Sequence, residues 1–251
     1  MHHFFADPQN INLENNTIHI LGEDVKHIQK SLRLKEKEKI SVADGSGKGY
    51  LTQITSLEND LVVVRIIEEM SSQEKLNATR TLYQGIAKGS KMDFIIQKSV
   101  ELGIDNIIPV ITEYTVVQLK EKDTDKKRQR WQKIAEEAAK QCKRFALPTV
   151  YPPVSYAKAV SEHIDQNDGS LHFLAYELES DTSVKKLLSE ISIEKYSNFG
   201  IWIGPEGGFD DHEIKLALDA GVNIVGLGPR ILRTETAGIV LLSILLYEME
   251  I

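Results

Sequence analysis

The fold is decided by two stretches of sequence, Ile203-Gly-Pro-Glu-Gly-Gly-Phe209 and Leu227-Gly-Pro-Arg-Ile-Leu-Arg-Thr-Glu-Thr-Ala237. Each stretch begins where a short apolar run ends, residues 199–203 in one case and 222–227 in the other. Such runs predict buried strands, and glycines let the chain turn sharply and approach a ligand closely. Because a helical pattern follows each stretch, both loops are expected at the carboxyl ends of strands, where open α/β sheets bind ligands.

The helices after the two loops have recognisable starting points. Asp210 and Glu213 have the spacing of a capping box, which predicts a helix over residues 211–220. Thr234 is expected to cap the helix that carries the apolar run 238–247. This run is apolar on nearly all sides, so the helix is predicted to be buried from several directions.

Residues 73–251 alternate between strand and helix patterns outside these two loops as well. Further strand patterns cover residues 80–87, 107–111 and 171–175, and further helical patterns cover residues 92–102, 127–144 and 182–189. Strands that alternate with helices predict a mostly parallel sheet covered by helices.

The first 72 residues have a different pattern, with short strands separated by turns. Strand patterns cover residues 18–21, 39–43, 50–55 and 61–67, and only residues 24–32 have a helical pattern. This arrangement predicts a small β-barrel, and the polar stretch 68–75 is the expected linker. The sequence therefore predicts an α/β protein with two domains, residues 1–72 and 73–251.

The composition is typical of a globular protein and favours a cytoplasmic location. No apolar run approaches the roughly 18 residues that a membrane-spanning helix needs. The chain has a single cysteine, Cys142, which excludes an internal disulfide and fits a reducing compartment. The seven histidines show no ligand spacing, so no metal site is expected.

The charge distribution leaves nucleic-acid binding open. The formal net charge is −7, yet residues 117–147 contain ten basic and five acidic side chains. A positive segment within an acidic chain fits a surface that contacts phosphates. It fits equally well a solvated helix with ion pairs along its exposed face.

The two loops carry the polar side chains that are candidates for a site. Arg233 can pair with Glu206 or Glu235, or it can hold a phosphate, and its chemistry alone does not choose between these roles. An ordinary tight turn between strand and helix is the alternative interpretation of the first loop. The glycines at 204, 207 and 208 lack the spacing of a dinucleotide-binding loop, and no Walker spacing is present, so a nucleotide-using enzyme is disfavoured.

The two stretches together resemble the paired signature of the RsmE family, 16S ribosomal RNA uracil-N3 methyltransferases in the SPOUT superfamily. The resemblance extends over nearly the whole chain and includes Leu32-Arg33, Asp44-Gly-Ser46, Lys88-Gly-Ser-Lys91, Ile96-Gln-Lys-Ser-Val-Glu-Leu-Gly103 and Arg130-Trp-Gln-Lys-Ile134. It implies an N-terminal PUA-like barrel for RNA binding and a C-terminal SPOUT domain with a deep trefoil knot. It also implies a homodimer that uses S-adenosylmethionine to methylate 16S ribosomal RNA within the small ribosomal subunit.

The resemblance assigns the cofactor residues, and the reaction chemistry and the charge distribution give candidates for the other roles. The cofactor pocket is expected to be lined by Gly204, Glu206, Gly207, Gly208, Leu227, Gly228, Ile231 and Leu232. Arg233 is expected to be the cation that stabilises the uracil as N3 loses its proton, and Glu206, Glu235 or water is expected to accept that proton. The RNA footprint is expected to include Arg33, Lys91, Lys98, Lys143 and Arg144.

A few positions depart from the family pattern, and one alternative function has to be weighed. Tyr114 and His3 stand where an arginine is common, and Lys140 and Cys142 replace a frequent glutamate and serine. These departures concern the expected RNA side of the protein. The alternative function is a non-catalytic RNA-binding factor for ribosome assembly, which would not need the intact loops at 203–209 and 227–237.

Overall fold

The computed structural model of the protein describes residues 1–71, 78–117, 121–163 and 169–249. The chain divides into two compact units, residues 1–75 with 139–147, and residues 76–138 with 148–251. Part of the expected linker, residues 72–75, and Lys120 of the basic segment lie outside the described residues. No helix of the described ranges is long and apolar enough to cross a membrane.

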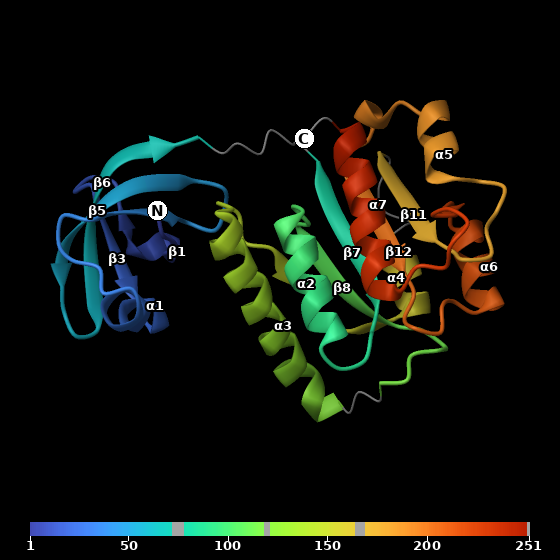
Figure 1. Ribbon diagram of the computed structural model, residues 1–251, viewed down its shortest axis with the longest axis horizontal. Helices are drawn as coiled ribbons and strands as arrows, with labels where there is room; N and C mark the ends of the chain where they lie inside the picture. The colour runs from blue at the N-terminus through green and yellow to red at the C-terminus, as the bar shows by residue number, and fades with distance from the viewer. Residues whose placement is uncertain (72–77, 118–120, 164–168, 250–251) are drawn as a thin grey trace. The chain divides into compact units, whose positions relative to one another are not determined.

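The first unit is built on a curled sheet of six strands in the order β1-β4-β5-β6-β3-β2 (Figure 1). Neighbouring strands are antiparallel except for the parallel pair β1 and β4. The strands are β1 (His3–Phe5), β2 (Ile11–Asn12), β3 (Thr17–Leu21), β4 (Lys39–Ala43), β5 (Gly49–Leu57) and β6 (Leu61–Met70). All four strands that the sequence predicts here are present.

A short helical segment closes the core of the first unit. It consists of α1 (Glu23–Lys26) and the single π-helical turn η2 (His27–Ser31), and a 3-10 turn, η1 (Pro8–Asn10), precedes β2. Val25 and Ile28 of this segment are buried with Ile40 and Ile54 of the sheet. The helical pattern at 24–32 is thus confirmed, because its apolar residues face the sheet.

The second unit contains a seven-stranded sheet in the order β10-β8-β7-β12-β11-β13, with β9 beside β8. The strands are β7 (Thr79–Gly85), β8 (Asn106–Ile111), β9 (Thr149–Val150), β10 (Val154–Ser155), β11 (Ser170–Ala175), β12 (Asn198–Ile203) and β13 (Asn223–Val225). Every pair is parallel, as the alternation of strand and helix patterns predicts. The loops after β12 and β13 therefore both start at the end of the sheet where the parallel strands have their carboxyl ends.

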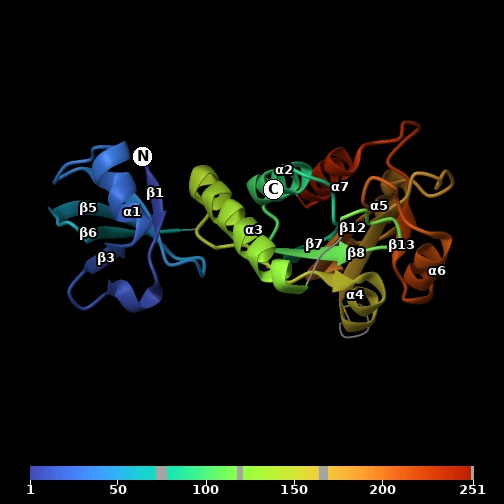
Figure 2. The same cartoon turned by 90° about the horizontal axis from the view of Figure 1, so that it is seen from below.

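Helices cover both faces of this sheet. They are α2 (Lys91–Glu101), α3 (Glu121–Cys142), α4 (Tyr156–His163), α5 (Val184–Glu190), α6 (Asp211–Asp219) and α7 (Thr234–Glu248), with the 3-10 turn η3 (Ile193–Lys195). Figure 2 shows α2 and α7 on one face and α4 and α6 on the other. On the α4 face the ring of Tyr83 stacks on Trp202 with a centroid distance of 3.8 Å.

The structure corrects two expectations about local structure and adds elements that were not predicted. Thr234 does not cap α7 but is its first residue, and its hydroxyl donates a hydrogen bond to the carbonyl of Gly204 instead. The helix predicted over 127–144 ends at Cys142, so Arg144 lies beyond it. Helix α4 and the two-residue strands β9 and β10 were not predicted, because such short segments carry little periodicity.

Candidate functional site

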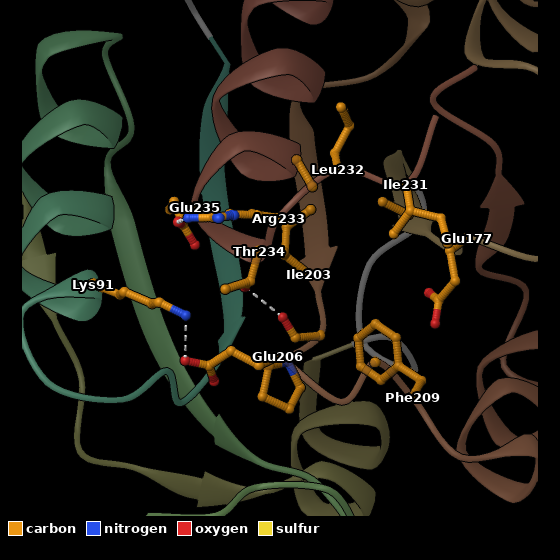
Figure 3. Close-up of a pocket in the computed structure, with 15 residues that line it drawn as sticks. Lys91, Glu177, Ile203, Glu206, Phe209, Ile231, Leu232, Arg233, Thr234 and Glu235 are labelled. Atoms are coloured by element: carbon orange, nitrogen blue, oxygen red, sulfur yellow. Dashed lines mark hydrogen bonds and ion pairs between the residues drawn. The ribbon is translucent and has the colours of Figure 1, made fainter. Parts of the chain in front are cut away.

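A cavity of about 270 Å³ lies at the carboxyl ends of β11 and β12 and at the start of α7 (Figure 3). Glu206, Arg233 and Glu235, the three residues expected to act in catalysis, all line it. Ile203 and Ile231 contribute apolar wall. The parallel sheet explains the convergence, because both glycine-bearing loops leave the sheet at the same edge.

A second hollow adjoins this cavity and shares Glu177, Ile231 and Leu232 with it. Leu227 and Gly228 of the second loop line the hollow. The structure thus brings together seven of the eight residues expected to bind the cofactor. They are Gly204, Glu206, Gly208, Leu227, Gly228, Ile231 and Leu232.

The eighth residue, Gly207, lines neither of these hollows. A Cβ atom at Gly207 would lie 2.7 Å from the Cβ atom of Tyr114, so a side chain there meets protein. Tyr114 also donates a hydrogen bond from its hydroxyl to Asp210, 3.1 Å away. The segment after β8 is therefore packed against the first loop, and Tyr114 holds that loop from its outer side.

The capping box predicted at Asp210 and Glu213 is confirmed, and it does more than start α6. One carboxylate oxygen of Glu213 accepts the backbone N–H of Asp210, and the other accepts the backbone N–H of Glu113, both at 3.0 Å. Burial raises the pKa of Glu213, although these two N–H bonds oppose the shift. Glu213 thus joins the first loop to the segment that carries Tyr114.

Glu206 is held by one group from the β7–α2 connection and one from the first residue of α2. Its carboxylate accepts hydrogen bonds from the backbone N–H of Lys88 at 3.1 Å and from the Nζ atom of Lys91 at 2.9 Å. Partial burial raises the pKa of Glu206, but the bonds from Lys91 and Lys88 outweigh it, so the pKa lies below its ordinary value. Glu206 is therefore an anion at neutral pH and a weaker base than a free glutamate.

Arg233 and Glu235 flank the first residue of α7. The Arg233 side chain is 82% exposed, and its Nη1 atom lies 4.0 Å from a carboxylate oxygen of Glu235. The Glu235 side chain is only 17% exposed, and its Oε2 atom is buried without a hydrogen-bond partner among the described residues. The structure thus places Arg233 beside Glu235 and not beside Glu206, which pairs with Lys91.

Sequence reasoning missed Glu177 and assigned Lys91 to a different role. Glu177 follows β11 and lines both hollows, while Lys91, expected in the RNA footprint, points toward Glu206 in the first cavity (Figure 3). The position of Glu177 just after an apolar run was the available signal. It was not decisive, because the sequence does not show that β11 lies between β12 and β13.

The five residues expected to contact RNA fall in both units. Arg33, Lys143 and Arg144 belong to the first unit, and Lys91 and Lys98 lie on α2 of the second. Lys98 is paired with Glu101 at 2.8 Å. Arg144 is 5% exposed, so its side chain is not presented to solvent as the prediction assumed, whereas Lys143 and Arg33 are exposed.

Three of the departures from the family pattern, His3, Lys140 and Cys142, belong to the first unit. His3 is buried and bonded to the hydroxyl of Ser41 and to the carbonyl of Arg144, each at 2.9 Å. Lys140 forms a partly buried ion pair with Asp24 at 2.8 Å. These two side chains therefore stabilise the first unit, and the effect of the departures on RNA contact stays a prediction. Among the described residues, no group of acidic, histidine or cysteine side chains is placed to hold a metal ion.

The parallel sheet with a cavity at its carboxyl end is the fold of an RNA methyltransferase, and the comparison with known families shows this class. Residues 74–246 match an RNA methyltransferase domain, and residues 20–67 match an RNA methyltransferase PUA domain. Ribosomal RNA small subunit methyltransferase E of Bacillus subtilis is 35% identical over 94% of this chain and 91% of its own length. The protein of the same name from Aquifex aeolicus is 31% identical over 98% and 99%.

A solved structure extends the similarity to three dimensions. Ribosomal RNA small subunit methyltransferase E of Neisseria gonorrhoeae, bound to S-adenosyl methionine, superimposes with a TM-score of 0.85 at 31% identity. The alignment covers 98% of this chain and 97% of that one. The chain belongs to the family of ribosomal RNA small subunit methyltransferase E, the RsmE family.

Proposed function

We propose that the protein transfers a methyl group from S-adenosylmethionine to N3 of a uridine in the 16S RNA of the small ribosomal subunit. The family supports methyl transfer to ribosomal RNA. The observation that carries the proposal is that Glu206, Arg233 and Glu235, from the loops after β12 and β13, line the same cavity. Its RNA substrate implies that the protein acts in the cytoplasm.

The residues around the cavity fit S-adenosylmethionine. The cofactor carries positive charge on its sulfonium and ammonium groups, and the carboxylates of Glu177, Glu206 and Glu235 line the same cavity. Ile203 and Ile231 supply apolar surface for the uncharged parts of the ligand. A cavity of about 270 Å³ with an adjoining hollow is also of the size that small-molecule sites have, roughly 300 to 1,000 Å³.

The residues of the chain perform the remaining tasks. When bound, S-adenosylmethionine supplies an activated methyl group, so most of the rate enhancement has to come from positioning. The exposed guanidinium of Arg233 reaches outward from the cavity to stabilise the negative charge that develops on the uracil. Glu206 is poorly suited to accept the N3 proton, because hydrogen bonds from Lys91 and Lys88 lower its pKa. Glu235, whose Oε2 atom has no hydrogen-bond partner among the described residues, is the other candidate in the cavity. Water remains an alternative acceptor.

The target atom sets a further requirement. N3 lies in the Watson–Crick edge of uracil, so the uridine has to be unpaired or flipped out of a helix before it can react. The exposed basic side chains Arg33 and Lys143 belong to the unit that matches the PUA domain and supply phosphate contacts for such an RNA.

The protein is also proposed to form a homodimer through α7. This helix is apolar on nearly all sides, yet Tyr247 is 80% exposed, and Phe94 of the neighbouring helix α2 is 43% exposed. Ile239 and Val240 are only partly buried. An apolar surface on two adjacent helices is suited to pack against the same surface of a second copy.

A trefoil knot is proposed from the path of the chain after β13. This strand is at the edge of the sheet beside β11, yet α7 packs against β12 and α2, so residues 226–233 have to cross back past the end of β11. The backbone N–H of Gly226 is bonded to the carbonyl of Thr182 at 2.9 Å. The connection from β13 to α7 therefore lies against the connection from β11 to α5, as a threaded chain requires.

The proposed function is tested by methyl transfer itself. The protein is incubated with labelled S-adenosylmethionine and unmodified small ribosomal subunits, and the digested RNA is analysed by mass spectrometry. We expect one methyl group per subunit, at N3 of a uridine, and its loss in Arg233→Ala. Label on another atom would overturn the proposed target. RNA binding with no thermal shift from S-adenosylmethionine or S-adenosylhomocysteine would favour the non-catalytic factor, and a shift with ATP alone would favour a nucleotide-using enzyme.

A further inference from the structure

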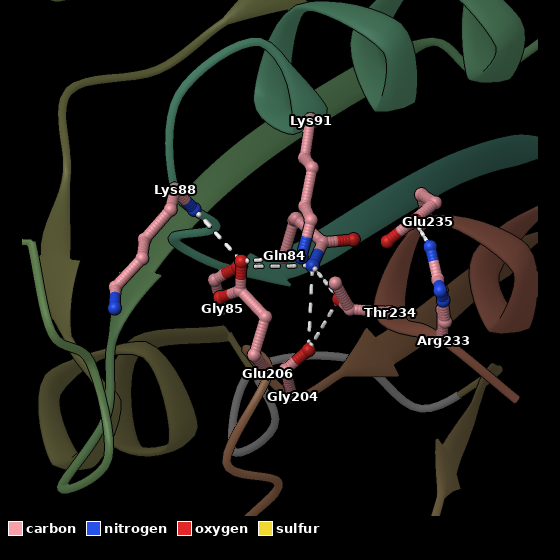
Figure 4. Close-up of polar contacts among 9 residues, drawn as sticks. All are labelled: Gln84, Gly85, Lys88, Lys91, Gly204, Glu206, Arg233, Thr234 and Glu235. Carbon is pink, nitrogen blue, oxygen red and sulfur yellow. Dashed lines mark hydrogen bonds and ion pairs between the residues drawn. The ribbon is translucent and has the colours of Figure 1, made fainter. Parts of the chain in front are cut away.

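A buried chain of hydrogen bonds connects β7, the first loop and α7 directly behind the cavity (Figure 4). The side-chain amide of Gln84 donates to the hydroxyl of Thr234 at 2.9 Å, and that hydroxyl donates to the carbonyl of Gly204 at 2.6 Å. The same amide nitrogen also donates to the carbonyl of Gly85 at 2.9 Å. Gln84 is 0% exposed and Thr234 is 7% exposed, so water does not compete for these bonds.

The direction of each bond in this chain is determined by its partners. The carbonyls of Gly85 and Gly204 can only accept, so the end of the Gln84 amide that faces them is its NH₂ group. The Thr234 hydroxyl accepts from Gln84 and therefore turns its own proton to Gly204. Bonds in such a chain strengthen one another. The Oε1 atom of Gln84 is buried without a partner among the described residues, so only the NH₂ end of the amide takes part in this chain.

The backbone at this point is packed as closely as the hydrogen bonds require. A Cβ atom at Gly85 would lie 2.4 Å from the ring of Pro205, so the end of β7 touches the first loop with no side chain between them. Gly204, Pro205 and Thr234 line the cavity, whereas Gln84 does not. Any effect of Gln84 on a ligand is therefore transmitted through these neighbours.

We propose that Gln84 is a positioning residue that, through the Thr234 hydroxyl, fixes the spacing between the two loops and so shapes the cofactor cavity. The inference rests on the proposed function, because it takes S-adenosylmethionine as the ligand. Gln84, Thr234 and Gly204 have no titratable side chain, so the contribution of Gln84 is constant with pH. The consequence of losing it is weaker cofactor binding, with turnover at saturating cofactor largely retained.

The test compares variants that remove one hydrogen bond each. Gln84→Met keeps the length of the side chain but removes its donor, and Thr234→Val removes the hydroxyl at nearly constant volume. Thr234→Ser keeps the hydroxyl. The matched control is Thr52→Val in the first unit, where a buried threonine hydroxyl donates to the carbonyl of Ile40 at 3.0 Å. This control removes the same kind of hydrogen bond at a residue that belongs to the other unit and does not line the cavity.

The measurements are the Kd of S-adenosylhomocysteine by calorimetry, the Tm, and the KM for S-adenosylmethionine and kcat with small ribosomal subunits. We expect Gln84→Met and Thr234→Val to raise Kd and KM about tenfold, which is about 1.4 kcal/mol, with kcat within about threefold of the wild type. The Kd of the double variant should not exceed the higher Kd of the two single variants, because both changes break the same chain of hydrogen bonds. Thr234→Ser should restore most of the affinity, and Thr52→Val should lower the Tm without changing Kd.

Different results contradict the positioning role of Gln84 and the proposed function. An unchanged Kd in Gln84→Met, or an equal rise in Kd in Thr52→Val, overturns the positioning role of Gln84. If Gln84→Met does not fold, Thr234→Val and its serine counterpart decide the question alone. Wild-type protein that binds no S-adenosylhomocysteine overturns the proposed function, and the inference with it.

Discussion

The Nζ atom of Lys91 lies 2.9 Å from a carboxylate oxygen of Glu206, and the pair joins the start of α2 to the glycine-bearing loop after β12. Both side chains line the cavity, so the pair places one positive and one negative charge where cofactor and uracil are proposed to meet. Because each partner holds the other, the two charges keep fixed positions in the cavity.

The first prediction concerns the pH dependence of the reaction. The folded-state pKa of Glu206 is below the ordinary value of about 4.3, so the carboxylate stays ionised from neutral pH down to mildly acidic pH. Its contribution to stability is present above the unfolded pKa and is lost as pH falls through the lowered folded pKa. We expect Glu206→Gln to lower kcat/KM about tenfold while the shape of the pH–rate profile between about pH 6 and 9 stays the same. A limb of the profile that vanishes in this variant would identify Glu206 as the base.

The second prediction concerns Arg233, whose exposed guanidinium is proposed to stabilise the uracil anion. Arg233→Ala should lower kcat by about 10² to 10³, as removal of a charge-stabilising donor does in other enzymes, with RNA affinity within about threefold. Arg233→Lys keeps the charge but not the planar fork and should recover only part of the rate. Single-turnover kinetics with small ribosomal subunits measures the step directly. Equal losses of RNA affinity and rate would instead make Arg233 an RNA-binding residue.

The third prediction concerns the salt dependence of RNA binding. Lys143 is exposed, so Lys143→Glu should weaken RNA binding and reduce the log–log salt slope by about 0.7 to 0.9, the value of one lost phosphate contact. Lys185→Glu, which reverses an exposed charge on α5, is the control and should leave the slope unchanged. The Kd of S-adenosylhomocysteine should be the same in both variants. Fluorescence anisotropy at several salt concentrations checks the slopes, and equal slopes in the two variants would remove Lys143 from the footprint.

Arg144 is not a suitable partner for that experiment. Its side chain is buried in the first unit, so Arg144→Glu should lower the Tm, because it places an uncompensated carboxylate in the interior. Thermal unfolding checks this expectation. An unchanged Tm together with weaker RNA binding would show that Arg144 reaches the RNA after all.

The fourth prediction concerns the homodimer. Tyr247→Glu places a charge on the exposed apolar side of α7 and should convert a dimer to a monomer at micromolar concentration. Leu13→Glu makes the same kind of change at a residue of the first unit that is 58% exposed, and it should leave the dimer intact. Light scattering measures both. A wild-type protein that is monomeric and fully active would contradict the proposed dimer.

The sequence alone predicted the parts of the fold that depend on local pattern. The capping box at Asp210 and Glu213 and the strand at residues 199–203 are present where they were expected. Both depend on neighbours within a few residues, so the order of side chains is enough to specify them. The convergence of the two loops was also predictable, because strands that alternate with helices pair in parallel and end at one edge.

The first unit shows where local pattern is not sufficient. Residues 139–147 complete it through Lys140 with Asp24 and through the carbonyl of Arg144 with His3, contacts between residues more than one hundred positions apart. The sequence placed these nine residues in the basic segment 117–147, because charge and helical spacing say nothing about distant partners. Burial of Arg144 and His3 follows from that packing.

The sequence by itself determined that each of the two glycine-bearing loops lies between a strand and a helix. Its family resemblance determined which chemistry the loops serve. Only the tertiary structure decided which side chains pair within the site. It placed Lys91 beside Glu206, left Arg233 beside Glu235, and directed the Thr234 hydroxyl to Gly204 instead of to the start of its own helix. The physical reason is that hydrogen bonds and ion pairs act over about 3 to 4 Å, and the order of strands that brings residues 84, 204 and 234 within that range is a property of the folded sheet.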